Sequence, residues 1–168
     1  HERGATMQVG VMAPQGWKGE YDGWDPAEAW ARTVELARQA EDLGFESLWV
    51  PEHTHIPTSR RTPPPTRDAE LREEYKRTLD PFVGLAMAAA ATERLVVGTG
   101  ICLVAQHDPI VTAKAGATLD VLSGGRFVFG VGFGWNEDEA ASHGVDMRTR
   151  REQAREHVLA MRALWRDD

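Results

Sequence analysis

The chain has 168 residues, 42% of them hydrophobic, and a formal net charge of -7 that comes from 26 acidic residues against 19 Lys and Arg. This length and apolar content are typical of one globular domain and argue against a disordered chain. The basic residues are scattered, and no apolar run approaches the roughly 18 residues of a membrane-spanning helix, so nucleic acid and membranes are not expected as partners.

The amino-terminal end has no pattern typical of a signal peptide, and a cytoplasmic location is therefore expected. The first methionine, Met7, directly precedes the first apolar run. We interpret residues 1–6 as a remnant outside the fold and residues 7–168 as the domain. The single cysteine, Cys102, cannot form an internal disulfide and lies in an apolar run, where we expect it to be buried.

Four apolar segments predict buried strands, at residues 7–13, 45–50, 95–104 and 126–133. A helical pattern follows each segment, as a parallel sheet requires. Three of the expected helices begin with the same dipeptide, in which Asp caps the helix and Pro takes its first position: Asp25-Pro26, Asp80-Pro81 and Asp108-Pro109. The first helix is expected to end at Gly44. An apolar stripe marks a last helix and consists of Ala154, Val158, Met161, Leu164 and Trp165.

A long segment, residues 51–79, separates the second strand from the next helix and contains "TPPPT" and a charged stretch with a helical pattern. Loops of this length inside a compact domain often cover a binding site, so we interpret the segment as a lid-like insertion. A solvated insertion without a binding role is the alternative.

Four consecutive βα units fit two α/β folds, a doubly wound parallel sheet or the first half of a (β/α)8 TIM barrel. A closed barrel needs about 250 residues, so this chain is too short to complete one.

Glycine recurs at every second position in the strand-like stretch "GRFVFGVGFGWNEDEA", at Gly130, Gly132 and Gly134. Residues two apart share one face of a strand, so these glycines leave one face without side chains. Gly98, Gly100 and Gly10 repeat the pattern in the other strands. The cleared face predicts either a floor for a flat ligand or close backbone packing in a narrow interior. The spacing does not fit a dinucleotide-binding fingerprint, which disfavours a Rossmann fold.

The second strand ends in "WVPEHTH", which places Glu52, His53 and His55 at the carboxyl edge of the sheet, where α/β folds bind ligands. A histidine beside a glutamate can be held in one tautomer and exchange protons near neutral pH, so His53 is the best catalytic candidate. A metal site that adds His107 and Asp108, as in a metal-dependent hydrolase, and a structural histidine are the alternatives. The acid-rich stretch "NEDEAASHGVD" has the pattern of a solvated loop with Asn136 or Glu137 capping a short helix.

Several segments together resemble the luciferase-like flavin and deazaflavin oxidoreductases, and within them the branch that depends on coenzyme F420. These segments are "GFESLWVPEH", "DPFVGLAMAAAATERLVVGTGICLV", "DPIVTAKAGATLDVLSGGRFVFGVGFGWNEDEAASHGVD" and "MRALW". The resemblance implies a (β/α)8 barrel that binds F420 or FMN at its carboxyl face and moves a hydride between this cofactor and a small organic substrate. Most members of the family are homodimers.

The resemblance also assigns site residues. Glu52 and His53 match an acid and a histidine that face the deazaflavin ring, and the histidine is implicated in catalysis. Gly100 and Ile101 match a bulge in the third strand where many F420-dependent members have a non-proline cis peptide. The turn that lies along the cofactor corresponds to Gly132, Phe133, Gly134, Trp135 and Asn136. No metal ligand is implied.

The chain departs from the family pattern in two ways. Trp135 stands where F420-dependent sugar-phosphate dehydrogenases have a catalytic glutamate, which argues against sugar-phosphate oxidation by that mechanism and suggests that Trp135 forms a wall of the substrate pocket. Strands five to eight are absent, so we expect either a fragment of a longer enzyme or a half barrel that pairs with a second copy. An F420-dependent oxidoreductase is the leading hypothesis. An FMN-dependent monooxygenase and a cofactor-free half-barrel binding or assembly module are the alternatives.

Overall fold

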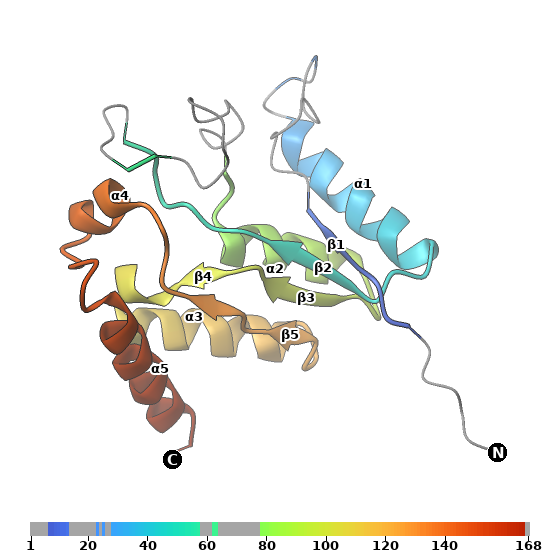
Figure 1. The fold of residues 1–168 in the computed structure, drawn as a ribbon. Coiled ribbons are helices and arrows are strands. Elements are labelled where there is room, and N and C mark those ends of the chain that lie inside the picture. The colour runs from blue at the N-terminus through green and yellow to red at the C-terminus, as the bar shows by residue number, and fades with distance from the viewer. Residues whose placement is uncertain are drawn as a thin grey trace.

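The structure is a computed structural model that describes residues 7–13, 23, 25, 28–57, 62–63 and 78–166. Residues 1–6 and most of the lid-like insertion, including its charged stretch with a helical pattern, lie outside these ranges. The described chain is an alternation of strands and helices (Figure 1). Its elements are β1 (Gly10–Met12), α1 (Ala29–Asp42), β2 (Ser47–Val50), α2 (Pro81–Ala91), β3 (Val96–Thr99), β4 (Cys102–Leu103), η3 (Val104–Gln106), α3 (Pro109–Leu122), β5 (Phe127–Val128), β6 (Val131–Gly132), α4 (Glu137–Ser142) and α5 (Arg150–Arg166).

The strands form a parallel sheet in the order β1-β2-β3-β5, so each strand pairs with the one before it in the βα series. The third and fourth predicted strands are each interrupted. β4 and β6 follow the interruptions and pair with one another in parallel. The expected four parallel βα units are therefore confirmed. The interruption of the third strand lies at Gly100 and Ile101, where the resemblance implied a bulge, whereas a continuous strand at 126–133 was wrong.

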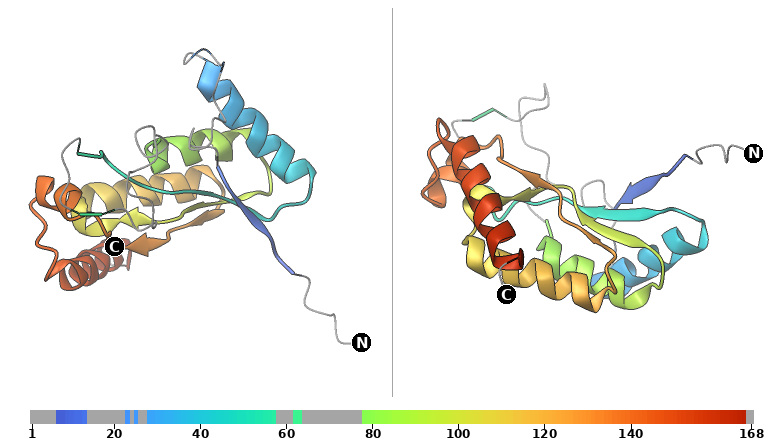
Figure 2. Two further views of the ribbon diagram at one scale, coloured as in Figure 1. Left: turned by 45° about the horizontal axis from the view of Figure 1, so that its top comes forward. Right: turned by 90° about the horizontal axis from the view of Figure 1, so that it is seen from below.

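Helices α1, α2 and α3 lie in sequence on one face of the sheet, and α5 packs against α3 (Figure 2). The opposite face is covered by no helix among the described elements. The core between sheet and helices is formed by residues such as Leu48, Val50, Leu85, Val97 and Leu119. A second cluster joins α5 to the end of the third strand and includes Cys102, Val104, Ala113, Ala154 and Met161. Cys102 is buried, as its apolar surroundings in the sequence predicted.

Two of the three Asp-Pro helix starts are confirmed. The Asp80 carboxylate accepts a hydrogen bond from the Val83 N–H at 2.9 Å, and Asp108 accepts from two backbone N–H groups in the first turn of α3. The third start, Asp25-Pro26, is not described in full, because Pro26 lies outside the described residues; α1 itself begins at Ala29 and has Glu28 at its N-cap position without a side-chain cap. Asp25 contributes its backbone carbonyl, which accepts from the Glu28 N–H at 2.8 Å. Gly44 follows the end of α1 with φ at 82°, as expected of a left-handed terminating glycine.

On the sheet face where Gly10 and Gly98 carry no side chains, the space is filled by the Trp49 side chain. A methyl group at Gly98 would overlap the indole ring of Trp49, and one at Gly10 would lie 2.7 Å from its Nε1. The indole donates to Ser47 Oγ at 2.9 Å and so covers a buried hydroxyl. In the fourth strand, the space at Gly132 is taken by the Ile101 side chain. Close packing of neighbouring side chains therefore accounts for these glycines within the described chain, and a ligand floor on this face stays a prediction.

Arg126 ties the amino-terminal edge of the sheet to α2. Its guanidinium donates to the carbonyls of Leu95 at 2.8 Å and Ala89 at 2.9 Å. It also donates to the Ser123 carbonyl and to both oxygens of Thr92. One charged side chain thus donates hydrogen bonds to carbonyls from three segments and holds them together.

We predict that Arg126→Ala lowers the free energy of unfolding by about 2–4 kcal/mol, because several half-buried carbonyls lose a charged donor. Urea unfolding measures the change. Arg148→Ala is the matched control, since its ion pair with Asp146 is exposed and its loss is expected to change the free energy of unfolding much less than the loss of Arg126. Equal losses in the two variants would contradict the proposed role of Arg126.

Candidate functional site

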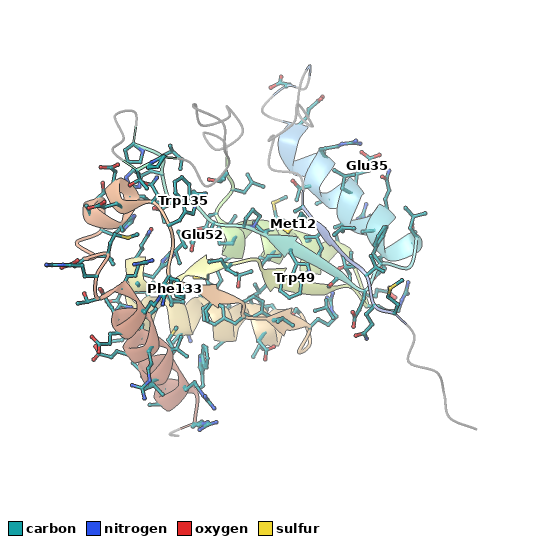
Figure 3. All side chains as sticks on the ribbon, viewed as in Figure 1. Met12, Glu35, Trp49, Glu52, Phe133 and Trp135 are labelled. Atoms are coloured by element: carbon teal, nitrogen blue, oxygen red, sulfur yellow. The ribbon has the colours of Figure 1, made fainter. Side chains whose placement is uncertain are left out.

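The candidate site lies at the carboxyl end of the sheet, where β2 leads into Glu52 and His53. Figure 3 shows Glu52 and Trp135 at this end of the molecule, with α4 beside them. The half-buried His53 carbonyl accepts from Thr78 Oγ1 at 2.8 Å, which joins the two described ends of the insertion. The site is therefore built from the segments that follow β2 and β6.

His53 is paired with Glu139 and not with its sequence neighbour. Its Nδ1 lies 2.8 Å from Glu139 Oε2, and the two side chains are 9% and 1% exposed. The other carboxylate oxygen of Glu139 accepts from the Thr54 N–H at 3.0 Å. The edge of the His53 ring meets Trp135, with centroids 5.8 Å apart and planes at 77°. The expectation that Glu52 orients His53 was wrong, and the orienting carboxylate comes from 86 residues further along the chain.

Sequence reasoning missed Glu139 because the stretch "NEDEA" was interpreted as a solvated loop. Asn136 caps α4 by accepting from the N–H groups of Asp138 and Glu139 through its Oδ1, as the sequence suggested. The cap turns Glu139 and Ala140 into the interior, where both are buried, while Glu137 stays exposed. A cap residue followed three positions later by an acid and then by a small apolar residue was the available signal.

Asn136 is itself buried, at 2% exposure. Its Oδ1 is used by the cap, whereas its Nδ2 has no hydrogen-bond partner among the described residues. A buried amide donor without an acceptor is costly, and such groups are commonly satisfied by a ligand or an ordered water. The side chain can therefore both terminate the glycine turn and offer a donor to a bound molecule.

The Glu52 side chain points into the protein, away from Glu139. It is 5% exposed, and its two oxygens accept from the Leu103 N–H at 2.5 Å and pair with His107 Nε2 at 2.8 Å. The hydrogen bond to Glu52 raises the pKa of His107 above its ordinary value; burial opposes this effect, and the charges of Glu52 and Asp80 reinforce it. Glu52 thus links β2 to β4 and η3, and its contact with a cofactor ring stays a prediction.

Cys102 completes a group with Glu52 and His107 in which one donor atom from each lies within 4.8 Å of the others. Burial raises the pKa of the Cys102 thiol strongly, and the charge and hydrogen bond of Glu52 add to this effect. Both oxygens of Glu52 already have donors, the Leu103 N–H and the His107 ring. The three residues are accounted for as a hydrogen-bonded group, and the expectation of no metal ligand stays a prediction for metal analysis.

The remaining predicted residues line the exposed side of this end of the sheet. The Gly100–Ile101 peptide is cis, as the resemblance implied, and Ile101 is 39% exposed. Gly134 has φ at 72°, a conformation that favours glycine, and its carbonyl accepts from Arg150 Nε at 3.3 Å. Phe133 is half exposed beneath the guanidinium groups of Arg150 and Arg151. Contact of these residues with a cofactor stays a prediction.

Two further histidines, His55 and His143, lie close to one another beside Thr54. Thr54 Oγ1 is 2.6 Å from His143 Nε2 and 3.3 Å from His55 Nδ1, and the two imidazole rings are 5.5 Å apart. Burial lowers the pKa of His143, and the neighbouring His55 lowers it further. Within the described residues, His55 forms no three-residue metal-ligand group, so its predicted metal role gains no support.

The family model described as luciferase-like monooxygenase matches residues 7–168. The chain belongs to this family. An uncharacterised protein of Mycobacterium tuberculosis is 53% identical over 131 residues, which are 77% of this chain and 46% of that protein. An F420-dependent glucose-6-phosphate dehydrogenase of Intrasporangium calvum is 30% identical over 163 residues, which are 94% of this chain and 43% of that protein. The solved structure of monooxygenase RslO1 from Streptomyces bottropensis matches with a TM-score of 0.74 at 26% sequence identity. The match covers 96% of this chain and 44% of the RslO1 chain.

These matches confirm the family and the TIM-barrel type of fold that the sequence predicted. The luciferase-like family contains oxidoreductases and monooxygenases, among them proteins named for F420 dependence and a fold neighbour solved with FMN. The chain spans about half the length of the relatives that it matches. No helix in the described part of the chain is long and apolar enough to cross a membrane.

We predict opposite pH dependences for two histidine variants. The raised pKa of His107 means that its stabilising effect is complete below about pH 6 and is lost as the pH rises through the raised pKa. The stability advantage of the native protein over His107→Gln should therefore shrink from pH 6 to 9.

The pKa of His143 is lowered from its ordinary value of 6.5. The native protein should therefore lose stability relative to His143→Gln as the pH falls below 6.5. Chemical denaturation from about pH 5 to 9 measures both effects, and parallel curves would contradict the assignments.

Proposed function

We propose that this luciferase-like protein is an F420-dependent oxidoreductase that transfers a hydride between the deazaflavin and a small organic substrate. The observation that carries the proposal is His53, which is held by the buried Glu139 and bordered by Trp135 at the carboxyl end of the sheet. Ligands bind at this end in barrels of parallel strands. The F420-dependent relative at 30% identity supports the choice of cofactor.

The residues at this end fit a flat, phosphate-bearing cofactor. The half-exposed Ile101 and Phe133 provide apolar surface, and the buried Asn136 Nδ2 provides a donor that no described residue satisfies. Arg150 and Arg151 place positive charge beside the turn at Gly134. Under the proposal, Ile101, Gly132 and Phe133 border the ring system, whereas Gly134, Trp135 and Asn136 lie along its polar tail.

When bound, F420 would accept or supply the hydride. The protein's own contribution is to hold His53 in one orientation, so that it exchanges a proton with the heteroatom of the substrate whose neighbouring carbon gains or loses the hydride. Proton and hydride together account for a two-electron oxidation of an alcohol or the reverse reduction. Trp135 excludes water from one side of the imidazole and narrows the substrate pocket.

An FMN-dependent monooxygenase is the second candidate function. The fold neighbour with bound FMN and a relative named 4-hydroxyprotoasukamycin monooxygenase, 30% identical over 146 residues, favour it. Trp135 also favours it in part, because the position lacks the acid expected of F420-dependent sugar-phosphate oxidation. The cofactor decides between the two candidates.

Strands five to eight are needed to complete the proposed pocket. The open face of the sheet carries exposed apolar side chains, including Met12 and Val128, and a full barrel would cover them. We propose that the covering half is supplied by a continuation of this chain or, failing that, by a second copy. An intact mass near 18.6 kDa for an active, cofactor-binding protein would contradict the first option, and a monomer of that mass would contradict both.

We predict that the purified protein binds F420 with an affinity at least about tenfold above that for FMN. Absorbance titration separates the two, since bound F420 absorbs at about 420 nm and FMN at about 450 nm. Preference for FMN would support the monooxygenase, and binding of neither would support the cofactor-free binding or assembly module.

We further predict that His53→Gln keeps F420 binding but lowers the rate at which a panel of primary and secondary alcohols reduces F420 by about 100-fold, because the proton acceptor is lost. His157→Gln is the control, since His157 bonds the Val104 carbonyl from α5, away from His53. An unchanged rate in His53→Gln would remove His53 from the mechanism.

A further inference from the structure

The contacts of Glu139 specify more than the position of His53. One oxygen, Oε1, faces the Thr54 N–H at 3.0 Å, and a backbone N–H can only donate. The other oxygen, Oε2, faces His53 Nδ1 at 2.8 Å. An ionised carboxylate carries no proton on either oxygen, so Oε2 is offered to His53 only as an acceptor.

We propose that Glu139 is the positioning residue that holds neutral His53 in the tautomer with its proton on Nδ1. In that tautomer Nε2 has no proton and acts as an acceptor, so His53 serves as the base that takes a proton from the substrate. The role in catalysis rests on the proposed function, whereas the tautomer itself rests on the contacts of Glu139 alone.

The surroundings keep this pair dry and in register. Glu139 is 1% exposed, and the His53 side chain is 9% exposed. The Asn136 cap begins α4 three residues before Glu139 and so sets the direction in which the carboxylate points. Trp135 is in T-shaped contact with the imidazole ring. The imidazole is thereby restrained both by a hydrogen bond and by an aromatic contact.

The isosteric variant Glu139→Gln makes a sharp test, because glutamine has one acceptor and one donor group in place of two acceptors. The Thr54 N–H keeps the oxygen, so the new NH2 group faces His53 Nδ1. A donor at that position requires Nδ1 to accept, which moves the ring proton to Nε2. The variant is therefore expected to reverse the tautomer without changing the shape of the site.

The experiment is ¹⁵N NMR of the histidine side chains over a pH series from 6 to 9, in the whole protein without added cofactor. We expect the neutral His53 of the native protein to show a protonated Nδ1 and an unprotonated Nε2, and Glu139→Gln to exchange the two signals. Glu137→Gln, an exposed acid of the same helix, should leave them unchanged. Glu139→Asp, which keeps the carboxylate, should retain the native pattern in part.

A native His53 that is protonated on Nε2, or on both nitrogens throughout the series, would overturn the proposal even if every variant failed to fold. Unchanged signals in a folded Glu139→Gln variant would overturn it as well. With an alcohol that reduces F420, Glu139→Gln should lower kcat by about 100-fold and leave KM within about threefold. A native tautomer as predicted together with no hydride transfer would reject the proposed function and retain the role of Glu139.

Discussion

A carboxylate that is buried away from water needs hydrogen-bond donors for both oxygens, and two such carboxylates organise the carboxyl end of this sheet. Glu52 collects a backbone N–H from β4 and the His107 ring, whereas Glu139 collects the Thr54 N–H and the His53 ring. Each acid therefore connects segments that are more than 50 residues apart. The place of His53 follows from this requirement.

Glu52 and His53 are adjacent in the chain, but their side chains face different directions. Glu52 belongs to the segment after β2 and reaches inward to the end of the third strand, where Cys102 is buried beside it. His53, the next residue, turns the other way toward α4. Alternation along an extended chain explains this division, because successive side chains point to opposite sides. The Glu52 side of the segment consequently stabilises the fold, while the other side carries the candidate catalytic residue His53.

Local rules predicted much of the fold. The caps of Asp80 and Asp108, the end of α1 at Gly44 and the order of the strands depend on neighbouring residues and on periodicity, and the structure confirms them. The interruptions of the third and fourth strands were not predictable from periodicity, since the apolar pattern continues across them. The occupant of the glycine-cleared face was also missed, because Trp49 belongs to a different strand from Gly98 and Gly100.

The sequence by itself determined the four βα units, the position of His53 at a ligand-binding edge and, through its motifs, the luciferase-like family. These properties depend on residues that are close in the chain or on a pattern that extends along it. Only the tertiary structure decided which acid serves which histidine. Glu52 is adjacent to His53 in sequence, but the carboxylate that reaches Nδ1 is that of Glu139, since pairing of a buried side chain depends on distance in space after α4 has packed against the end of β2.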